Sequence, residues 1–523
     1  MKLALAAFLL VSFASTALHA QYPPNPIKHV VVIIQENRTP DNLFQGLCAF
    51  GSGCGTGSTQ YDIASTYVDS SGNTGPLLPV GLATNFDLDH SHGGPGLNGT
   101  VSGWEFEYTN RGVSGSPGVP VPPTCGANVF GCAVPTDSQF MYVYNTAVTN
   151  TNNSKGGLLD PYLTLATRYG WANRMFQTNQ GPSYPAHQFL FGGTSAPSAA
   201  DDAGGIFVAE NGTFTDVGCA APATAKVQLI RPVVPMPSTP PYGTETKGDT
   251  VPPCFTHESM ADLFANANPQ ISWTYYAASE KNANGGANML GSIWTAPNSL
   301  SSICIPAKDG NGNLQCTGSY WTKGAANGYV DPNPPDVLSD IANCKLAQMN
   351  WVTPSGQYSD HPVNSGQGPA WVTAIINAIG NSTACDGGAG YWQDTIVFLT
   401  WDDWGAWYDH VAPVILSNTA KYQDQYGYQL GFRVPLVVIS AYSPQVGYIN
   451  NVQHDFGSIL KAIEAIFSLG EGKLGFADAR SPDDLHNFFN FSQTPTTYTT
   501  IPTVLPSTFF TSGAAPLEPP DTD

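Results

Sequence analysis

The sequence predicts an α/β protein in which helices flank a central, mostly parallel sheet. Three short apolar runs carry this prediction, at residues 29–34, 395–399 and 434–439. Each is rich in Val, Ile and Leu without regular polar alternation, which is typical of strands that are buried on both faces. Two segments with apolar residues at helical spacing, 371–379 and 455–469, supply helices for the faces of such a sheet.

The segment 455–469 carries the strongest helix signal in the chain. Its apolar face consists of Phe456, Ile459, Leu460, Ile463, Ile466 and Phe467. Asp455 is a suitable N-cap because its carboxylate can accept from the first free amides, and Gly470 stands just past the expected end.

The chain of 523 residues is long enough for one large domain with insertions. We expect that domain to span residues 21–492. Residues 200–333 are rich in Gly, Pro, Ser, Thr and Asn and contain four cysteines, so we expect an insertion or cap over the sheet. Residues 493–523 are rich in Pro and Thr without periodicity and predict an irregular tail.

The N-terminus has the features of a secretory signal peptide. Lys2 precedes an apolar run over 3–13, and Ala20 ends a stretch suited to cleavage, so residues 1–20 are expected to be removed. The apolar run is too short for a stable membrane anchor. We therefore expect a secreted or periplasmic protein.

The cysteine count agrees with export. Ten cysteines in an exported chain favour disulfides, and the absence of a C-x-x-C pair argues against a thiolate zinc site. Two pairs are close enough in sequence to staple loops, namely Cys48 with Cys54 and Cys125 with Cys132.

Charge restricts the partners. The formal net charge is −20, which argues against nucleic acid as a partner and against tight docking on anionic membranes. An alternative is that the acidity serves solubility alone.

A pair of acidic or amide residues is separated by one or two residues from the end of each of two predicted strands. Glu36-Asn37 follows the run 29–34, and Asp402-Asp403 follows the run 395–399. Since ligands bind beyond the carboxyl ends of strands in open α/β sheets, we expect both pairs at one edge. Three close carboxylates need a compensating cation or proton, and their oxygens suit Ca²⁺, Mg²⁺ or Mn²⁺, with Zn²⁺ not excluded. The alternative is that these residues form turns and helix caps.

A serine stands at the start of a second predicted element. Pro185 fits the first turn of a helix, which places Ser183 at or just before the helix N-terminus. Backbone N–H groups there attract phosphate oxygens, and a serine so placed can act as a nucleophile. The alternative is an ordinary N-cap serine.

Three histidines are candidates for proton transfer. His90, His361 and His410 each directly follow an aspartate, and such pairing raises the basicity of the imidazole and orients the ring. His410 also lies shortly after Asp402-Asp403. The alternative is that they are structural hydrogen-bonding groups.

Five segments resemble signatures of the bacterial phospholipase C/acid phosphatase family, in the family's order. The opening segment 27–44 is similar to K-H-I-V-V-L-x-x-E-N-R-S-F-D-x-x-F, and 181–185 matches G-P-[ST]-x-P. The segment 395–410 resembles a strand followed by Y-D-E-x-G-G-x-x-D-H-V. The segments 431–444 and 453–458 resemble G-x-R-V-P…I-S-P and D-H-x-S.

The resemblance implies an alkaline-phosphatase-like fold and a phosphoesterase catalytic domain over 21–492. It implies that Ser183 becomes transiently phosphorylated. The implied ligands of a divalent metal cation are Glu36, Asn37, Asp402 and Asp403. The implied phosphoryl-binding or proton-donating residues are His90, His361 and His410.

The resemblance leaves three functions open. The first is phospholipase C-type cleavage of a phosphodiester such as a phospholipid. The second is acid phosphatase action on phosphomonoesters, and the third is a secreted binding protein that keeps the fold without catalysis.

The chain departs from the family pattern at several positions. Asp403 replaces the usual Glu, Ala406 replaces a Gly, and His187 stands where relatives often carry Asn or Arg. Nearby Trp side chains could cradle a choline-like ammonium group or could pack under loops. They are Trp401, Trp404 and Trp407.

Overall fold

The computed structural model describes residues 24–69, 72–84, 86–88, 90–92, 120–121, 139–209, 218–231, 246–278, 292–362, 366–416 and 428–512. The expected signal peptide, the expected Cys125–Cys132 pair and the end of the expected tail lie outside these ranges.

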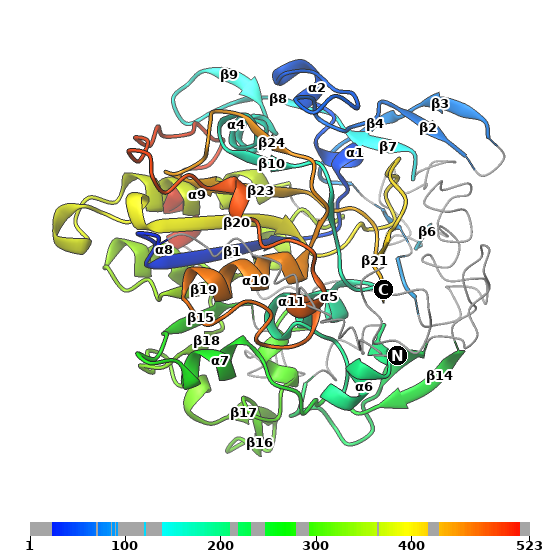
Figure 1. Ribbon diagram of the computed structural model, residues 1–523, viewed down its shortest axis with the longest axis vertical. Helices are drawn as coiled ribbons and strands as arrows, with labels where there is room; N and C mark the ends of the chain where they lie inside the picture. The colour runs from blue at the N-terminus through cyan, green and yellow to red at the C-terminus, as the bar shows by residue number, and fades with distance from the viewer. Residues whose placement is uncertain are drawn as a thin grey trace, which may run out of the picture.

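A single eight-stranded sheet forms the centre of the described chain, in the order β18-β15-β19-β1-β20-β23-β10-β24. Its strands are β1 (His29–Gln35), β10 (Gly170–Ala172), β15 (Trp273–Tyr276), β18 (Tyr329–Asp331), β19 (Met349–Val352), β20 (Thr395–Trp401), β23 (Leu436–Ser440) and β24 (Tyr448–Asn450). Within this sheet β23 runs against the other strands, which are parallel. Figure 1 shows the strands following one another from β24 at the top to β18 at the bottom. The predicted α/β class with a mostly parallel sheet is confirmed.

The three apolar runs of the sequence form the adjacent strands β1, β20 and β23. Every residue of β20 and β23 is buried, and so is every residue of β1 except His29. Burial on both faces of the pleat explains why these runs lack polar alternation. In the parallel pair β1–β20, Gln35 lies opposite Trp401, so the two strands end side by side.

The helices pack in two groups. One comprises α5 (Ser183–Gly192), α10 (Phe456–Ile466) and α11 (Ala477–Arg480). In the other, α4 (Asp160–Arg168), α8 (Asp336–Ala342) and α12 (Ser507–Thr511) surround α9 (Gly368–Asn381). Further helices are α1 (Pro40–Leu43), α2 (Leu47–Phe50), α6 (Ala199–Ala203) and α7 (Met260–Asn266).

Both predicted helices are present as α9 and α10. Asp455 is the N-cap of α10, and its side chain accepts a hydrogen bond from the backbone N–H of Ser458. The chain leaves the helix through Ser468 and Gly470, which have φ angles of 58° and 96°. The N-cap prediction is confirmed because a carboxylate satisfies an amide that has no partner within the helix.

Residues 200–333 contribute to the sheet as well as to its surroundings. Their strands β15 and β18 extend the parallel sheet beyond β19. The same segment forms a small sheet of β12 (Phe207–Val208), β13 (Val227–Arg231) and β14 (Thr246–Val251), and a hairpin of β16 (Ile305–Lys308) and β17 (Leu314–Thr317). The expectation of an insertion or cap therefore misses two strands, because both are short runs within a loop-rich composition.

The other strands form small two-stranded pairs. They are β2 (Thr66–Val68) with β3 (Thr74–Pro76), β4 (Leu78–Val80) with β7 (Met141–Val143), β5 (Asp87–Leu88) with β6 (Pro120–Val121), β8 (Ala147–Thr149) with β9 (Lys155–Gly157), β11 (Met175–Phe176) with β25 (His454–Asp455), and β21 (Ile415–Leu416) with β22 (Tyr428–Gln429).

The expected irregular tail has no helix or strand over 493–506 but then forms α12. Phe510 of α12 is buried, with its ring 5.3 Å from that of Trp371 and 5.0 Å from that of Tyr358. These aromatic contacts attach this part of the tail to α9.

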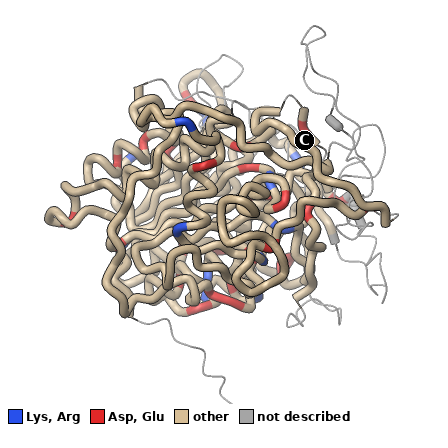
Figure 2. The backbone as a smooth tube through the Cα atoms, turned by 90° about the horizontal axis from the view of Figure 1, so that it is seen from above, with Lys and Arg blue, Asp and Glu red and all other residues tan. Residues whose placement is uncertain are grey.

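In the ranges that the structure describes, four disulfides join Cys48–Cys54, Cys219–Cys254, Cys304–Cys316 and Cys344–Cys385. Disulfides persist mainly in oxidising compartments outside the cytoplasm, and the expected Cys48–Cys54 pair is confirmed. Charged residues are sparse along the backbone tube in Figure 2, in agreement with a charged content of 11%. Among the described residues, no helix combines the length and apolar character needed to cross a membrane.

Candidate active site

The pairs Glu36-Asn37 and Asp402-Asp403, called the two acidic pairs below, meet where β1 and β20 end, as the sequence predicts. The backbone N–H of Asp402 donates to the carbonyl of Gln35 over 2.9 Å, which continues the ladder by one residue. The N–H of Asn37 then donates to Asp402 Oδ1 over 3.0 Å. Asn37 has a φ of 60°, a left-handed conformation that Asn adopts more readily than most residues.

Ser183 is the first residue of α5 and lies against both acidic pairs. Its Oγ is 3.3 Å from Glu36 Oε2 and 3.3 Å from Asp403 Oδ2. All three side chains are fully buried, and so is that of Asp402. A hydroxyl carries one proton, so this crowding of carboxylates requires further positive charge or protons nearby.

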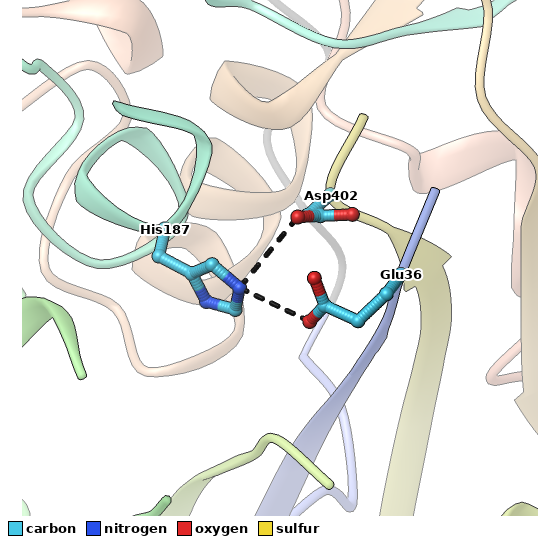
Figure 3. Close-up of side chains that lie close together, drawn as sticks. All are labelled: Glu36, His187 and Asp402. Carbon is cyan, nitrogen blue, oxygen red and sulfur yellow. Dashed lines mark hydrogen bonds and ion pairs between the residues drawn. The ribbon is translucent and has the colours of Figure 1, made fainter. Parts of the chain in front are cut away.

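His187 belongs to the same site because it stands one turn after Ser183 on the same face of α5. Its Nε2 lies 3.2 Å from Glu36 Oε1 and 3.8 Å from Asp402 Oδ2. Figure 3 shows the ring facing both carboxylates. Burial lowers the pKa of His187 to about 4, against the opposing effect of Asp402, so the imidazole is neutral near pH 7.

Hydrogen bonds orient the ring of His187. Its Nε2 lies 3.2 Å from Glu36 Oε1, and its Nδ1 lies 3.3 Å from the hydroxyl of Tyr275, which donates to the carbonyl of Trp294 over 2.8 Å. With the ring proton on Nε2, Glu36 accepts it. With the ring proton on Nδ1, Tyr275 accepts it and the lone pair of Nε2 faces Glu36, which is the form that could bind a cation between them.

These residues fit a divalent cation. One ligand atom each of Glu36, His187 and Asp402 lies within 4.8 Å of the others. Asp402 Oδ2 and Asn37 Oδ1 are buried and have no hydrogen-bond partner within the described part of the chain. Such a set of carboxylate, amide and imidazole donors could bind a metal, and the imidazole makes Zn²⁺ a candidate beside the cations that prefer oxygen ligands.

The ligand set expected from sequence did not include His187. The available signal was its spacing of four residues from Ser183, which places both side chains on one helix face. Tyr275 and Trp294 were also missed, because they come from the loop-rich segment 200–333 and reach the site through the fold alone.

His90 borders the same acidic pairs. Its Nδ1 lies 2.8 Å from the carbonyl of Leu88 and donates to it. In the neutral ring, Nε2 is then an acceptor for Asn37 Nδ2 at 2.9 Å, and it lies 3.9 Å from Asp403 Oδ2. Protonation at Nε2 would give His90 a donor beside Asp403.

His361 lies next to His90, with 6.4 Å between the ring centroids. Its Nδ1 donates to the carbonyl of Pro362 over 2.7 Å, and its Nε2 lies 3.6 Å from Asp87 Oδ2. Its ring is also 6.4 Å from that of Trp294, which stacks on His187. The fold therefore brings His90 and His361 together beside the acidic pairs.

His410 occupies a separate cluster. Its Nδ1 lies 2.7 Å from Asp41 Oδ2 and its Nε2 3.1 Å from Asp62 Oδ1. Because both ring nitrogens engage these aspartates, neither is directed at Ser183. Burial lowers the pKa of His410, but the two aspartates outweigh it and raise that pKa to about 9.

The three Trp side chains near the second acidic pair are buried, with exposed fractions of 0%, 0% and 1% for Trp401, Trp404 and Trp407. Trp401 donates to Asp360 over 3.1 Å, and the guanidinium of Arg38 lies 5.2 Å from the Trp407 ring centroid. The structure favours the packing interpretation, since an internal arginine already occupies the cation–π position.

The fold and the site define an α/β protein with a buried serine beside a candidate metal centre. Residues 27–470 match the model of the Phosphoesterase family, and the chain belongs to that family.

Two curated relatives are phospholipases C. The chain is 29% identical over 180 residues to phospholipase C B of Mycobacterium tuberculosis (strain CDC 1551 / Oshkosh), a match that covers 31% of this chain and 33% of that protein. It is 28% identical over 210 residues to the non-hemolytic phospholipase C of Burkholderia pseudomallei (strain K96243), covering 35% of this chain and 27% of that protein. The chain thus spans about a third of the length of the curated relatives it matches.

Among solved structures, one match is a protein in the alkaline phosphatase superfamily from Vibrio parahaemolyticus. The match covers 61% of this chain and 63% of the chain of that protein. The TM-score of this match is 0.29 and the identity is 11%.

Proposed function

We propose that this chain is an exported phosphoric ester hydrolase that cleaves phospholipids as a phospholipase C does, through a phosphoserine at Ser183. The observation that carries the proposal is the placement of Ser183 Oγ, 3.3 Å from Glu36 and 3.3 Å from Asp403, at the N-terminus of a ten-residue helix. Membership of the phosphoesterase family and similarity to two phospholipases C support the reaction class.

The side chains suit an in-line displacement. Ser183 Oγ attacks phosphorus, and its proton passes to Glu36 or Asp403, the carboxylates within its reach. The positive end of α5 stabilises charge on the phosphoryl oxygens. The bond from phosphorus to the leaving oxygen breaks, and that oxygen takes a proton from His90 or His361. Water then attacks the phosphoserine, which frees the phosphorylated product and restores the serine.

A divalent cation fits beside this serine. Glu36, His187 and Asp402 would hold it, with Asn37 and Asp403 at its border. When bound, it would offset the charge of the carboxylates and of the phosphoryl oxygens. Without it, the three buried carboxylates would repel an anionic substrate, so we expect hydrolysis to depend on Ca²⁺, Mg²⁺, Mn²⁺ or Zn²⁺.

The purified protein should be assayed on phosphatidylcholine and on p-nitrophenyl phosphate with each of these cations. Ser183→Ala should lower turnover by at least about 1,000-fold, as loss of a nucleophile does. Ser195→Ala is the matched control, because Ser195 is also buried but donates to the carbonyl of Val208 over 2.8 Å. Full activity of the Ser183 variant would exclude this serine as the nucleophile.

The same assay separates the remaining functions. Release of diacylglycerol without hydrolysis of the monoester supports a phospholipase C, whereas the reverse pattern indicates an acid phosphatase. If wild-type protein turns over no phosphate ester with any of the four cations, the non-catalytic binding protein becomes the better account.

A further inference from the structure

Arg433 is fully buried, and each of its five N–H groups has an acceptor. Nε and Nη2 donate to Asp409 Oδ2 over 3.1 and 3.0 Å, and Nη2 also donates to Asp41 Oδ1 over 3.2 Å. Nη1 donates to the carbonyls of Asp62 and Asn173 over 2.8 and 2.9 Å. Since a guanidinium has five N–H donors in a fixed planar arrangement, this side chain holds its acceptors in one relative placement.

Three of these acceptors belong to the segments that carry the site. Asp41 lies in α1, directly after the loop that follows β1. Asp409 lies in the loop that follows β20, and Asn173 lies just before β11, on the path to Ser183. Arg433 therefore connects the two acidic pairs and the serine segment at a distance from the reacting atoms.

The backbone around Arg433 strengthens this connection. The N–H of Gly431 donates to the carbonyl of Gln177 over 2.9 Å, and the N–H of Gln177 donates to the carbonyl of Phe432 over 3.0 Å. The side chain of Gln177 in turn accepts from the N–H of Trp404 over 3.1 Å. The segment leading to Ser183 is thus tied to the loop after β20 as well.

The charges of this cluster balance. Asp41, Asp62 and Asp409 face three basic side chains, which are Arg433, Arg174 and protonated His410. Arg174 Nη2 lies 2.7 Å from Asp62 Oδ2. Removing a buried partner from such a set leaves uncompensated charge, which is costly.

We propose that Arg433 is a positioning residue that fixes the loops after β1 and β20 relative to Ser183. The proposal concerns the reaction proposed above and rests on it for its functional part. Misplacement of reacting groups by about 1 Å can lower a rate by about 100-fold, so small shifts of these loops should appear in kcat.

The test compares Arg433→Lys with Arg480→Lys. Lysine keeps the charge but has only three N–H donors, so it cannot make all five of these hydrogen bonds. Arg480 is a matched control because it is 3% exposed and ion-paired, with Nη1 2.7 Å from Asp202 Oδ1, yet it lies in α11 outside the site loops. Hydrogen exchange is measured over residues 36–43 and 402–410, and kcat and KM are measured with phosphatidylcholine, the substrate of the proposed reaction, at a temperature at which both variants are folded.

We expect Arg433→Lys to accelerate exchange in both segments together and to lower kcat by about 10- to 100-fold, with a smaller change in KM. Arg480→Lys should leave both segments and kcat unchanged. If the lysine variant does not fold, Asp409→Asn makes the same comparison with the loss of one charge.

Unchanged exchange in the two segments, or an equal loss of kcat in the Arg480 variant, would overturn the positioning role. Failure of the proposed function is a separate result. It would appear as a wild-type protein without phosphate-ester hydrolysis, and the exchange measurement would then decide the positioning role by itself.

Discussion

Replacing His410 with asparagine should remove a pH-dependent contribution to stability. In the folded protein Asp41 and Asp62 hold the ring nitrogens of His410 at 2.7 and 3.1 Å and raise its pKa from 6.5 to about 9. Asparagine keeps a donor near Asp41 but does not titrate. The variant therefore removes the charge while retaining part of the contact.

The size of the effect follows from the pKa difference between the folded and unfolded protein. Each pKa unit corresponds to about 1.4 kcal/mol, so the charge of His410 can contribute at most about 3 kcal/mol to the free energy of unfolding. The His410 side chain is 27% exposed, and solvent screening lowers the expected value to about 2 kcal/mol. Because the folded pKa is the higher one, this stability is fully present below pH 6.5 and is lost as the pH rises through about 9.

The assay is denaturant unfolding of wild type and His410→Asn at several pH values between about 6 and about 10. The difference in free energy of unfolding between the two proteins should be largest at the acidic end and should shrink by about 2 kcal/mol toward the alkaline end. Titrating groups that do not interact with His410 cancel in this difference.

A difference that stays constant over the whole pH range would refute the reasoning. Kinetics on the same samples test the alternative role of His410 as a proton donor. That role predicts a large loss of kcat at a pH where the variant is folded, with a pH-independent difference in stability.

Three further predictions concern two glycines in left-handed conformation and one helix cap. Gly405 has a φ of 57°, and a Cβ added there would lie 2.6 Å from Asn37 Cβ. Gly405→Ala should therefore destabilise the protein by about 2 kcal/mol or more and impair hydrolysis, as measured by thermal unfolding and by activity. Gly470 has a φ of 96°, but no atom of the described residues lies within 4 Å of an added Cβ. Gly470→Ala should therefore lower the free energy of unfolding by about 1 kcal/mol and leave activity intact, and equal losses in both glycine variants would contradict this. Asp455→Ala should cost about 1 kcal/mol by removing the acceptor for the N–H of Ser458, whereas Asp455→Asn should retain most of that stability in denaturant unfolding.

The sequence determined the sheet centre and one edge of the site. Continuous runs of Val, Ile and Leu identified β1, β20 and β23, because strands buried on both faces have no polar alternation. Parallel strands end at a common edge, so the meeting of Glu36-Asn37 with Asp402-Asp403 followed from position alone. Local chemistry also located the starts of α5 and α10.

Tertiary structure alone decided which side chains complete the site. His187 became a candidate ligand through the placement of α5 against β1 and β20, and the segment 200–333 supplied Tyr275 to orient its ring. His410 moved into a cluster with Asp41 and Asp62 although it follows Asp402-Asp403 closely in sequence. Each of these contacts joins residues far apart in the chain, and, unlike the two strand ends, their segments carry no local pattern that predicts where they pack.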